Sequence, residues 1–290
     1  MVDLIIVLTL IRGGIYALLA VGFSLIFGVA RLINLAHTAF YMLAAYGTWY
    51  LSRQLGLGII ESIIITVVVV TLLGILSYRF ILDRIREHHA AVLLVTIALA
   101  LFFQELMYMV FKGHFRTLPS YIPGFVEIFG IRVLNQHILA ISVVAVMIIA
   151  LMLLLTKTKL GIAIRAVAND SEVASLMGIS ISRILLITMG LATFLGAVAG
   201  VTMAPSLTIN PTVWTSPLVT VMVIVVLGGL GSIKGSVIGA FIIGLVETLS
   251  IVVLSQGAYL STTFVLLVMV IVLVVRPGGL FGIVLEEERL

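Results

Sequence analysis

The sequence contains no cysteine and has few charged residues. Without cysteine the chain has no disulfide, no thiolate metal site and no thiol redox switch. Only 10% of its 290 residues are Asp, Glu, Lys or Arg, whereas soluble domains carry about 25%. This scarcity, together with 62% hydrophobic residues, excludes an ordinary water-soluble domain. The net charge of +4 is too modest to indicate a nucleic-acid partner.

Long apolar runs, such as 59–76 and 263–275, dominate what is present. Several approach the roughly 20 residues with which a helix crosses a bilayer. The runs are continuous rather than alternating, which excludes a membrane β-barrel and leaves helices as the spanning structure. We therefore predict an all-α fold: a polytopic transmembrane helical bundle of about eight or nine spans, with one or two broken or re-entrant helices.

Hydropathy divides the chain into a partial or interfacial helix at 2–11 followed by a series of spans. The predicted spans are 13–30, 34–51, 58–81, 90–111, 137–155, 183–203, 217–232, 236–255 and 259–275. The element at 217–232 is short and ends in glycines, so we expect it to be broken or re-entrant. The whole chain, 1–290, is treated as a single transmembrane domain.

The distribution of Lys and Arg predicts the orientation, because cytoplasmic loops carry an excess of both. With the polar loop 157–182 in the cytoplasm, eleven basic residues lie inside and five lie outside. The outside residues are Arg12, Arg53, Lys112, Arg116 and Arg132. The N-terminus is then external and the C-terminus cytoplasmic. The main external loop is 113–136, whose prolines and glycines predict turns; it either contacts a partner or is a solvated connection.

The loop 157–182 is longer than a reversal of direction requires, and it is helix-prone. A helix over 166–178 would have one apolar face, formed by Ala166, Val173, Ala174 and Met177. Acidic and capping groups stand near its start, and a glycine can end it. The helix suits either docking to a partner protein or lying on the membrane surface. The residues predicted for docking are Asn169, Asp170, Glu172, Ala174 and Gly178.

Asn34, His37 and Thr38 lie at the boundary between two apolar spans. Polar groups at membrane depth are costly and usually face protein or water. They indicate either a broken helix that lines a pathway or a tight interfacial turn in which Asn and His cap helix ends.

Glycines are dense at Gly228, Gly229 and Gly231. The nearby Lys234 does not follow a glycine as a phosphate-binding loop requires, so we predict no nucleotide site. These glycines suit a break between half-helices or close helix packing. Glu105 and Glu247 lie near or within spans, where they could couple protons or hydrogen-bond a neighbouring helix.

No arrangement of residues predicts an enzyme. The sequence has no His-Glu-x-x-His motif, and His88 and His89 form an isolated adjacent pair. Nothing places a serine and a lysine as nucleophile and base. We therefore expect no catalytic residue, no metal ligand and no cofactor on this chain.

In combination, these segments resemble the membrane permease of branched-chain amino-acid ABC importers, specifically the shorter of the two paired permease types. The resemblance runs nearly end to end. The segments that carry it are Gly14–Gly28, Asn34–His37 with Tyr41–Leu43, Arg116–Pro119, Gly161–Asn169, Gly228–Ser232 and Arg276–Gly282.

The resemblance implies that 157–182 is the coupling loop that meets the ATPase. Glu172, Ala174 and Gly178 fit the family's Glu-Ala-Ala-x-x-x-Gly pattern, but Val173 replaces its central alanine and the downstream part is absent. The residues predicted for the substrate pathway are Asn34, His37, Thr38, Gly228, Gly229 and Gly231.

The implied partners are a homologous second permease, two ATPase subunits that carry the ATP, an external substrate-binding protein and membrane lipid, in a bacterial or archaeal inner membrane. The implied function is import of branched-chain or other small amino acids by alternating access, with urea or small aromatic acids as alternative substrates. A competing class is an ATP-independent secondary transporter or channel in which Glu247 and His37 relay protons; a membrane enzyme is a distant third.

Overall fold

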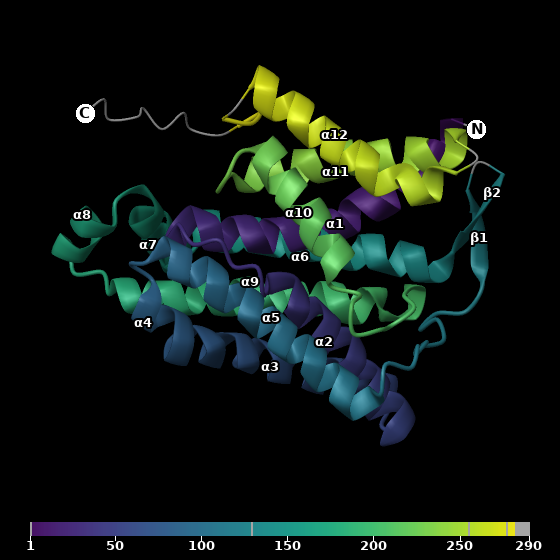
Figure 1. The fold of residues 1–290 in the computed structure, drawn as a ribbon, viewed down its shortest axis with the longest axis horizontal. Coiled ribbons are helices and arrows are strands. Elements are labelled where there is room, and N and C mark those ends of the chain that lie inside the picture. Colours follow the sequence, from purple (N-terminus) through teal and green to yellow (C-terminus); the bar gives the residue numbers. More distant parts are fainter. Residues whose placement is uncertain (1, 129, 255, 277, 282–290) are drawn as a thin grey trace.

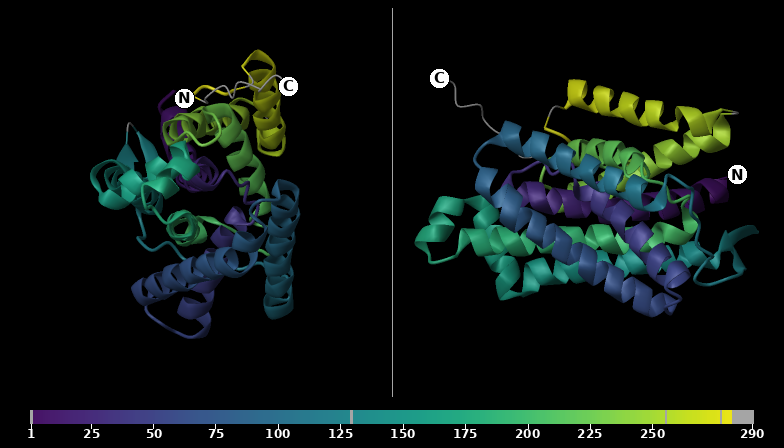
Figure 2. Two further views of the ribbon diagram at one scale, coloured as in Figure 1. Left: turned by 90° about the vertical axis from the view of Figure 1, so that its left-hand side faces the viewer. Right: turned by 60° about the horizontal axis from the view of Figure 1, so that its bottom comes forward.

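A computed structural model, which describes residues 2–128, 130–254, 256–276 and 278–281, shows an almost entirely helical protein (Figure 1). Its helices run along a common long axis and form one bundle, as two further views also show (Figure 2). Six of the described helices are long and apolar enough to cross a membrane. The prediction of an all-α, polytopic transmembrane bundle is confirmed.

The helices differ in length. The longer ones are α1 (Val2–Ala30), α3 (Ile59–Ser77), α5 (His89–Phe111), α6 (Asn135–Lys157), α9 (Ile181–Met203), α11 (Ile233–Val253) and α12 (Gly257–Val275). The shorter ones are α2 (His37–Trp49), α4 (Asp83–Ile85), α7 (Lys159–Asn169), α8 (Ser171–Leu176) and α10 (Thr215–Gly228). π-helical turns extend α2 over Tyr50–Gln54 and join α3 to α4 over Tyr78–Leu82, and a 3₁₀ turn over Ala204–Ser206 follows α9.

Two of the predicted spans, 34–51 and 217–232, contain the short helices α2 and α10. α10 has 14 residues, about 21 Å of helix, whereas the hydrocarbon core of a bilayer is about 30 Å thick. α2 has 13 residues, and the π-helical turn Tyr50–Gln54 continues it, so it is nearer to a full crossing. The short α10 agrees with the expectation that one or two helices are broken.

The N-terminal helix differs from the prediction. A partial helix at 2–11 that is separate from a span at 13–30 is wrong, because α1 runs unbroken through both. The glycine that suggests a break is a close-packing position: a Cβ on Gly13 would lie 2.6 Å from Cδ1 of Phe241 in α11. Arg12 therefore belongs to a helix and not to an external loop.

The predicted loop 113–136 is more ordered than its prolines and glycines indicate. It contains an antiparallel hairpin, β1 (Phe125–Ile128) and β2 (Ile131–Leu134), and α6 follows directly. The short alternating pattern of these strands is hidden in the sequence by the glycines and prolines around them.

The same loop is attached to the end of α9 and the segment that follows it. Arg116 and Ile209 exchange backbone hydrogen bonds of 2.9 and 2.8 Å. The Tyr121 hydroxyl donates to the Val201 carbonyl at 2.8 Å. Burial raises the pKa of the Tyr121 phenol, so the hydroxyl keeps its proton and remains a donor.

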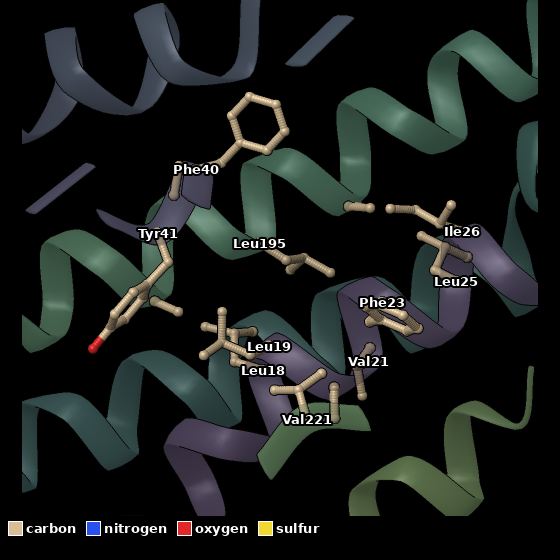
Figure 3. Close-up of a cluster of buried hydrophobic side chains, with 14 of the residues drawn as sticks. Leu18, Leu19, Val21, Phe23, Leu25, Ile26, Phe40, Tyr41, Leu195 and Val221 are labelled. Carbon is tan, nitrogen blue, oxygen red and sulfur yellow. The ribbon is translucent and has the colours of Figure 1, made fainter. Parts of the chain in front are cut away.

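The centre of the bundle lies around α1 and α9. Leu19 and Phe23 of α1 lie in one buried apolar cluster with Leu195 of α9 and Val221 of α10 (Figure 3). Small residues allow helices to approach closely where lipid supplies no hydrophobic driving force. Gly200 of α9, for example, leaves no room for a Cβ against the backbone of α2.

Large apolar side chains also cover the outer surfaces of α3, α5, α6 and α12. The exposed ones include Ile60, Ile64, Val68, Leu72, Leu94, Phe102, Val146, Ile149, Leu153, Leu267, Val270 and Val274. A surface this apolar is unsuited to water and is the surface expected to contact lipid.

The two ends of the bundle differ. α7 and α8 lie at one end, and the β-hairpin and the start of α1 lie at the other (Figure 1). The end of α12 is on the same side as α7 and α8 (Figure 1). The predicted cytoplasmic C-terminus, 282–290, and two residues of the last resemblance segment, Pro277 and Gly282, lie outside the described residues.

Replacing Gly244 by leucine should destabilise the protein, because a Cβ there would lie 2.7 Å from the backbone nitrogen of Gly13 and would force α11 away from α1. We expect a loss of about 1–3 kcal/mol, as is typical of overpacking. Thermal unfolding in detergent measures it. Gly14→Ala is the matched control, since the nearest atom to its new Cβ is 3.8 Å away; equal melting temperatures for the two variants would contradict the packing argument.

Candidate functional site

The first part of the candidate site is the place where the chain turns back into the bundle after α1. Arg31 takes a left-handed conformation with φ of 52°, and residues 31–36 are not helical. α2 then begins with the ring of His37 against Leu19 and Gly22, in the middle of α1. Gly22 lies about 12 Å along the helix from the end of α1, so α2 begins deep within the bundle.

Asn34 organises the start of α2. Its side-chain oxygen accepts from the backbone N–H of Ala36 at 3.0 Å, and its carbonyl accepts from the N–H of His37 at 3.2 Å. Its amide group donates to the sulfur of Met189 in α9 at 3.6 Å. No side-chain hydrogen bond caps α2, whose N-cap residue is Ala36, so the capping role considered for Asn34 is not seen. Asn34 instead forms a turn before the helix, and this turn is buried in protein, with Asn34 only 1% exposed.

The ring of His37 lies between α1 and α9. Its Nε2 is 3.1 Å from the carbonyl oxygen of Leu19, a geometry in which Nε2 carries the proton and donates. A Cβ on Gly22 would lie 2.9 Å from His37 Cε1, and one on Gly196 would lie 3.3 Å from it. The ring also meets Phe23 edge-on, with centroids 6.2 Å apart. Glycines in both neighbouring helices therefore make room for the imidazole.

Two polar atoms at the start of α2 have no hydrogen-bond partner within the described ranges: His37 Nδ1 and Thr38 Oγ1. Both side chains are fully buried. Most buried polar atoms in proteins are satisfied, so these two are available to water or a solute. The structure thus brings Asn34, His37 and Thr38 together in mid-bundle, and their part in a substrate pathway stays a prediction.

The other predicted pathway residues lie in the turn between α10 and α11. Gly229 and Gly231 have φ of 96° and 83°, which glycine adopts without strain. Gly228 packs directly on the backbone of Gly235, and a Cβ on Gly231 would lie 2.9 Å from the Cα of Gly28 in α1. The turn touches the last part of α1, whereas the start of α2 touches its middle. Close packing is seen for these glycines, and their part in a pathway stays a prediction.

A small cavity of about 120 Å³ connects this glycine turn with α7. Gly28 and Ser24 of α1, Arg165 of α7 and Gly231 are among the residues that line it. The Ser24 hydroxyl is buried without a partner in the described part of the chain. The cavity leaves space between the loop predicted for coupling and the end of the central helix.

The polar loop 157–182 forms two helices. A single helix over 166–178 is wrong, because Asp170 is extended, with φ of −150° and ψ of 110°, and separates α7 from α8. Its Oδ1 accepts from the N–H groups of Glu172 and Val173 at 2.9 and 3.0 Å. An acidic residue therefore does cap a helix here, as the sequence predicts, but the helix that Asp170 caps is the short α8.

A glycine ends α8 as predicted. Gly178 has φ of 82°, and its N–H donates to Ser175 at 2.9 Å while the N–H of Ile179 donates to Ala174 at 3.1 Å. This pair of bonds is the Schellman motif, which sets the direction in which the chain enters α9.

α8 exposes apolar side chains to the surroundings. Val173, Leu176 and Met177 are 54%, 87% and 78% exposed, whereas Ala174 is 3% exposed. Because Ala174 faces inward and its neighbours face outward, the predicted common face of Ala166, Val173, Ala174 and Met177 does not form. Asn169, Asp170 and Glu172 are exposed beside this tip. Apolar side chains exposed in a polar loop indicate a surface that binds protein or membrane.

α7, in contrast, is firmly anchored. Thr158 caps it by accepting the N–H of Gly161 at 3.0 Å. Ile164 and Val167 are 1% and 3% exposed, because α7 packs on α1, α6 and α9.

Asp83 links two segments at the α7–α8 end of the bundle, a contact that the sequence does not predict. Its carboxylate oxygens are 3.3 Å from Arg79 and 3.6 Å from Arg86. The hydroxyl of Ser182, at the start of α9, donates to it at 3.4 Å. The spacing Arg79-x-x-x-Asp83-x-x-Arg86 is the signal that could have indicated the ion pairs, since such residues share a helix face.

The two acidic residues singled out in spans have different surroundings. Glu105 is exposed and accepts from Gln104 at 3.3 Å. Glu247 of α11 is buried, lies 3.2 Å from the guanidinium of Arg12 and accepts the hydroxyl of Tyr16 at 3.1 Å. The hydrogen bond to a neighbouring helix, one of two roles considered for Glu247, is present; the Arg12 partner was missed because a helix break was expected there.

Within the described ranges, no cluster of three or more His, Cys, Asp or Glu residues is arranged to hold a metal ion.

A break in a helix, buried within a bundle of apolar helices, is a recurring feature of membrane transporters, and this is the class of protein that the fold and site define. The family model described as branched-chain amino acid transport system / permease component matches residues 5–273. The chain belongs to this family of permeases, as its sequence resemblance predicts.

Curated relatives match over nearly their whole length. The chain is 28% identical to the high-affinity branched-chain amino acid transport system permease protein LivH of Escherichia coli, over 93% of this chain and 92% of that protein. It is 26% identical to the corresponding permease protein BraD of Pseudomonas aeruginosa, with coverage of 93% and 92%. A probable branched-chain amino acid transport permease of Methanocaldococcus jannaschii is 26% identical, with coverage of 94% and 90%.

A solved structure, PsaBC from Streptococcus pneumoniae in complex with Fab, is similar in fold. The TM-score is 0.51 with 14% identity, over 91% of this chain and 89% of that chain. The likeness concerns the arrangement of helices alone.

Removing the cap of α8 with Asp170→Ala should loosen that helix by about 0.5–2 kcal/mol, because two N–H groups lose their acceptor. Hydrogen exchange read by mass spectrometry should then be faster for the amides of Glu172 and Val173. Ser171→Ala on the same turn is the control. Unchanged protection of α8 in Asp170→Ala would show that the cap does not hold this helix.

Proposed function

We propose that this chain is the transmembrane permease subunit of an ATP-driven ABC importer for branched-chain or other small amino acids. A homologous second permease, two cytoplasmic ATPase subunits that carry the ATP and an external substrate-binding protein complete the assembly, in a bacterial or archaeal cell membrane. Family membership supports this proposal, and so do the printed names of the relatives, which are permeases of branched-chain amino acid transport systems.

The observation that carries the ATPase contact is the exposed tip of α8. Leu176 and Met177 are the most exposed apolar residues of the polar loop, at 87% and 78%, and no other described part of the chain covers them. The capping bonds of Asp170 and the Schellman motif at Gly178 hold this tip in one conformation. A short, well-capped helix with an apolar tip is suited to insertion in a groove on another protein.

A movement of α8 can be transmitted directly to the buried start of α2. α8 leads through Gly178 into α9, and Met189 and Gly196 of α9 contact the start of α2 at Asn34 and His37. When the ATPase dimer closes, α8 shifts and α9 moves with it, so the contact between α9 and the start of α2 changes. ATP binding and hydrolysis bias this equilibrium between outward-open and inward-open states.

The orientation of the chain in the membrane follows from the proposed ATPase contact at α8. With α7 and α8 in the cytoplasm, the β-hairpin and the N-terminus are external, and the C-terminus is cytoplasmic. The described basic residues at the α7–α8 end are Arg31, Arg79, Arg84, Arg86, Lys157, Lys159, Arg165, Arg183, Lys234 and Arg276, which agrees with the positive-inside rule.

The competing hypothesis, an ATP-independent transporter with a proton relay, has less support. Glu247 is paired with Arg12 and Tyr16, and His37 is bonded to Leu19. No hydrogen bond between described residues links Glu247 to His37, so a relay between them would need further groups.

The proposed assembly is tested by solubilising the tagged chain gently and identifying the proteins that co-purify with it. We expect an ATPase pair and a second permease, and ATP-dependent uptake of leucine by the reconstituted complex. Urea and small aromatic acids are the alternative substrates to assay in parallel. A chain that is isolated alone and moves solute without ATP would refute the importer proposal.

Leu176→Glu should reduce ATP-dependent uptake by about tenfold or more, because a carboxylate replaces the apolar group that enters the ATPase groove. Membrane insertion and melting temperature should stay unchanged, since the side chain is 87% exposed. Leu176→Met preserves size and polarity and is the matched control. Normal uptake by Leu176→Glu would place the coupling contact elsewhere.

A further inference from the structure

Arg12 and Glu247 form an ion pair between membrane helices. Arg12 Nη1 of α1 lies 3.2 Å from Oε2 of Glu247 in α11. Counted from Ala30, Arg12 lies about 27 Å along α1, which places the pair near the end of the bundle that carries the β-hairpin. A charged group inside a membrane helix indicates a functional site unless its role is otherwise explained.

The pair is open on one side. The Arg12 side chain is 38% exposed while that of Glu247 is 6% exposed. Arginine has five N–H donors in a rigid fork, and a single one of them reaches an acceptor in the described residues. A guanidinium with free donors at membrane depth faces protein or a water-filled path in preference to lipid.

The hydroxyl of Tyr16 also bonds the carboxylate. Tyr16 lies one turn along α1 from Arg12 and donates to Glu247, with its hydroxyl 3.1 Å from each carboxylate oxygen. Arg12 and Tyr16 therefore hold the carboxylate of Glu247 from one face of α1, and the exposed side of the Arg12 guanidinium is left open.

We propose that Arg12 and Glu247, with Tyr16, form a binding site for a zwitterionic amino acid as it passes through the permease. The carboxylate of the solute binds the free donors of Arg12, and its ammonium group binds Glu247. The two ends of an amino acid are attached to one carbon, so they match an acid and a base that are themselves in contact. The inference rests on the proposed function for the identity of the solute.

A purely structural role explains the Arg12–Glu247 ion pair less well than substrate binding does. Two charges taken out of water lose hydration, and replacing such a pair by uncharged residues often leaves stability unchanged. Tight packing already holds α1 on α11, because Gly244 approaches the backbone of Gly13 there. The helices thus have a contact beside the ion pair that does not need the charges.

The decisive variant is the neutral pair Arg12→Gln/Glu247→Gln in the reconstituted complex. We expect the melting temperature to remain within a few degrees of wild type and ATP-dependent L-leucine uptake to fall about tenfold or more, a factor typical of losing charge-assisted hydrogen bonds. Uptake within about twofold of wild type would overturn the proposal. The control removes the surface pair of the hairpin, Arg132→Gln/Glu127→Gln, whose side chains are 72% and 61% exposed, and uptake should be unaffected.

A second measurement uses the wild-type chain alone in nanodiscs. A large excess of L-leucine should raise its melting temperature by about 1–2 °C, since a ligand that binds the folded state stabilises it. 4-Methylpentanoate lacks the ammonium group and 3-methylbutylamine lacks the carboxylate, so neither should have this effect. No shift with leucine, or an equal shift with either analogue, would overturn the proposal.

The nanodisc measurement needs no ATPase, so it separates this proposal from the proposed function. If uptake proves independent of ATP while leucine still stabilises the wild-type chain and not Glu247→Gln, the importer assignment fails and the zwitterion site stands. If uptake requires ATP but leucine has no effect on the chain, the zwitterion site fails and the importer assignment stands.

Discussion

A helix that stops halfway across a bilayer must have its end covered by protein, and the burial of the start of α2 between α1 and α9 is the contact on which this fold depends. Lipid offers the free N–H groups of a helix end no acceptor, so the cover must include polar groups. Asn34 supplies acceptors for the N–H groups of Ala36 and His37, and the carbonyl of Leu19 accepts from the imidazole of His37. Glycines at Gly22 and Gly196 let the neighbouring helices close around the imidazole. The remaining helices then surround this centre and present apolar side chains to lipid.

The sequence indicates the helices well and their ends less well. Long apolar runs are sufficient to predict spans, because the bilayer leaves few other solutions. The unbroken α1 was missed because the charged Arg12 separates the runs 2–11 and 13–30 in the sequence, and its partner in α11 is not apparent there. The pairing of Arg12 with Glu247 spans 235 positions in sequence, and no local pattern reveals it.

The polar loop 157–182 shows the same contrast between local and distant determinants. Asp170 and Gly178 are recognised from their chemistry, since a carboxylate at a helix start and a glycine at a helix end are favoured by local bonds. The periodicity nevertheless predicts one helix where there are two, because the outcome at Asp170 depends on what α7 is packed against. Ile164 and Val167 bury α7 in the bundle, whereas α8 buries Ala174 alone and otherwise follows its own cap.

The separation of α7 from α8 by one extended residue has a mechanical consequence. The cap at Asp170 and the Schellman motif at Gly178 fix α8 relative to the start of α9, while α7 is held in the bundle by its own contacts. Because no helical backbone joins α7 to α8, a load on the tip of α8 passes into α9 in preference to α7. A subunit docked on α8 would then act on α9 and leave the packing of α7 against α1 and α6 undisturbed.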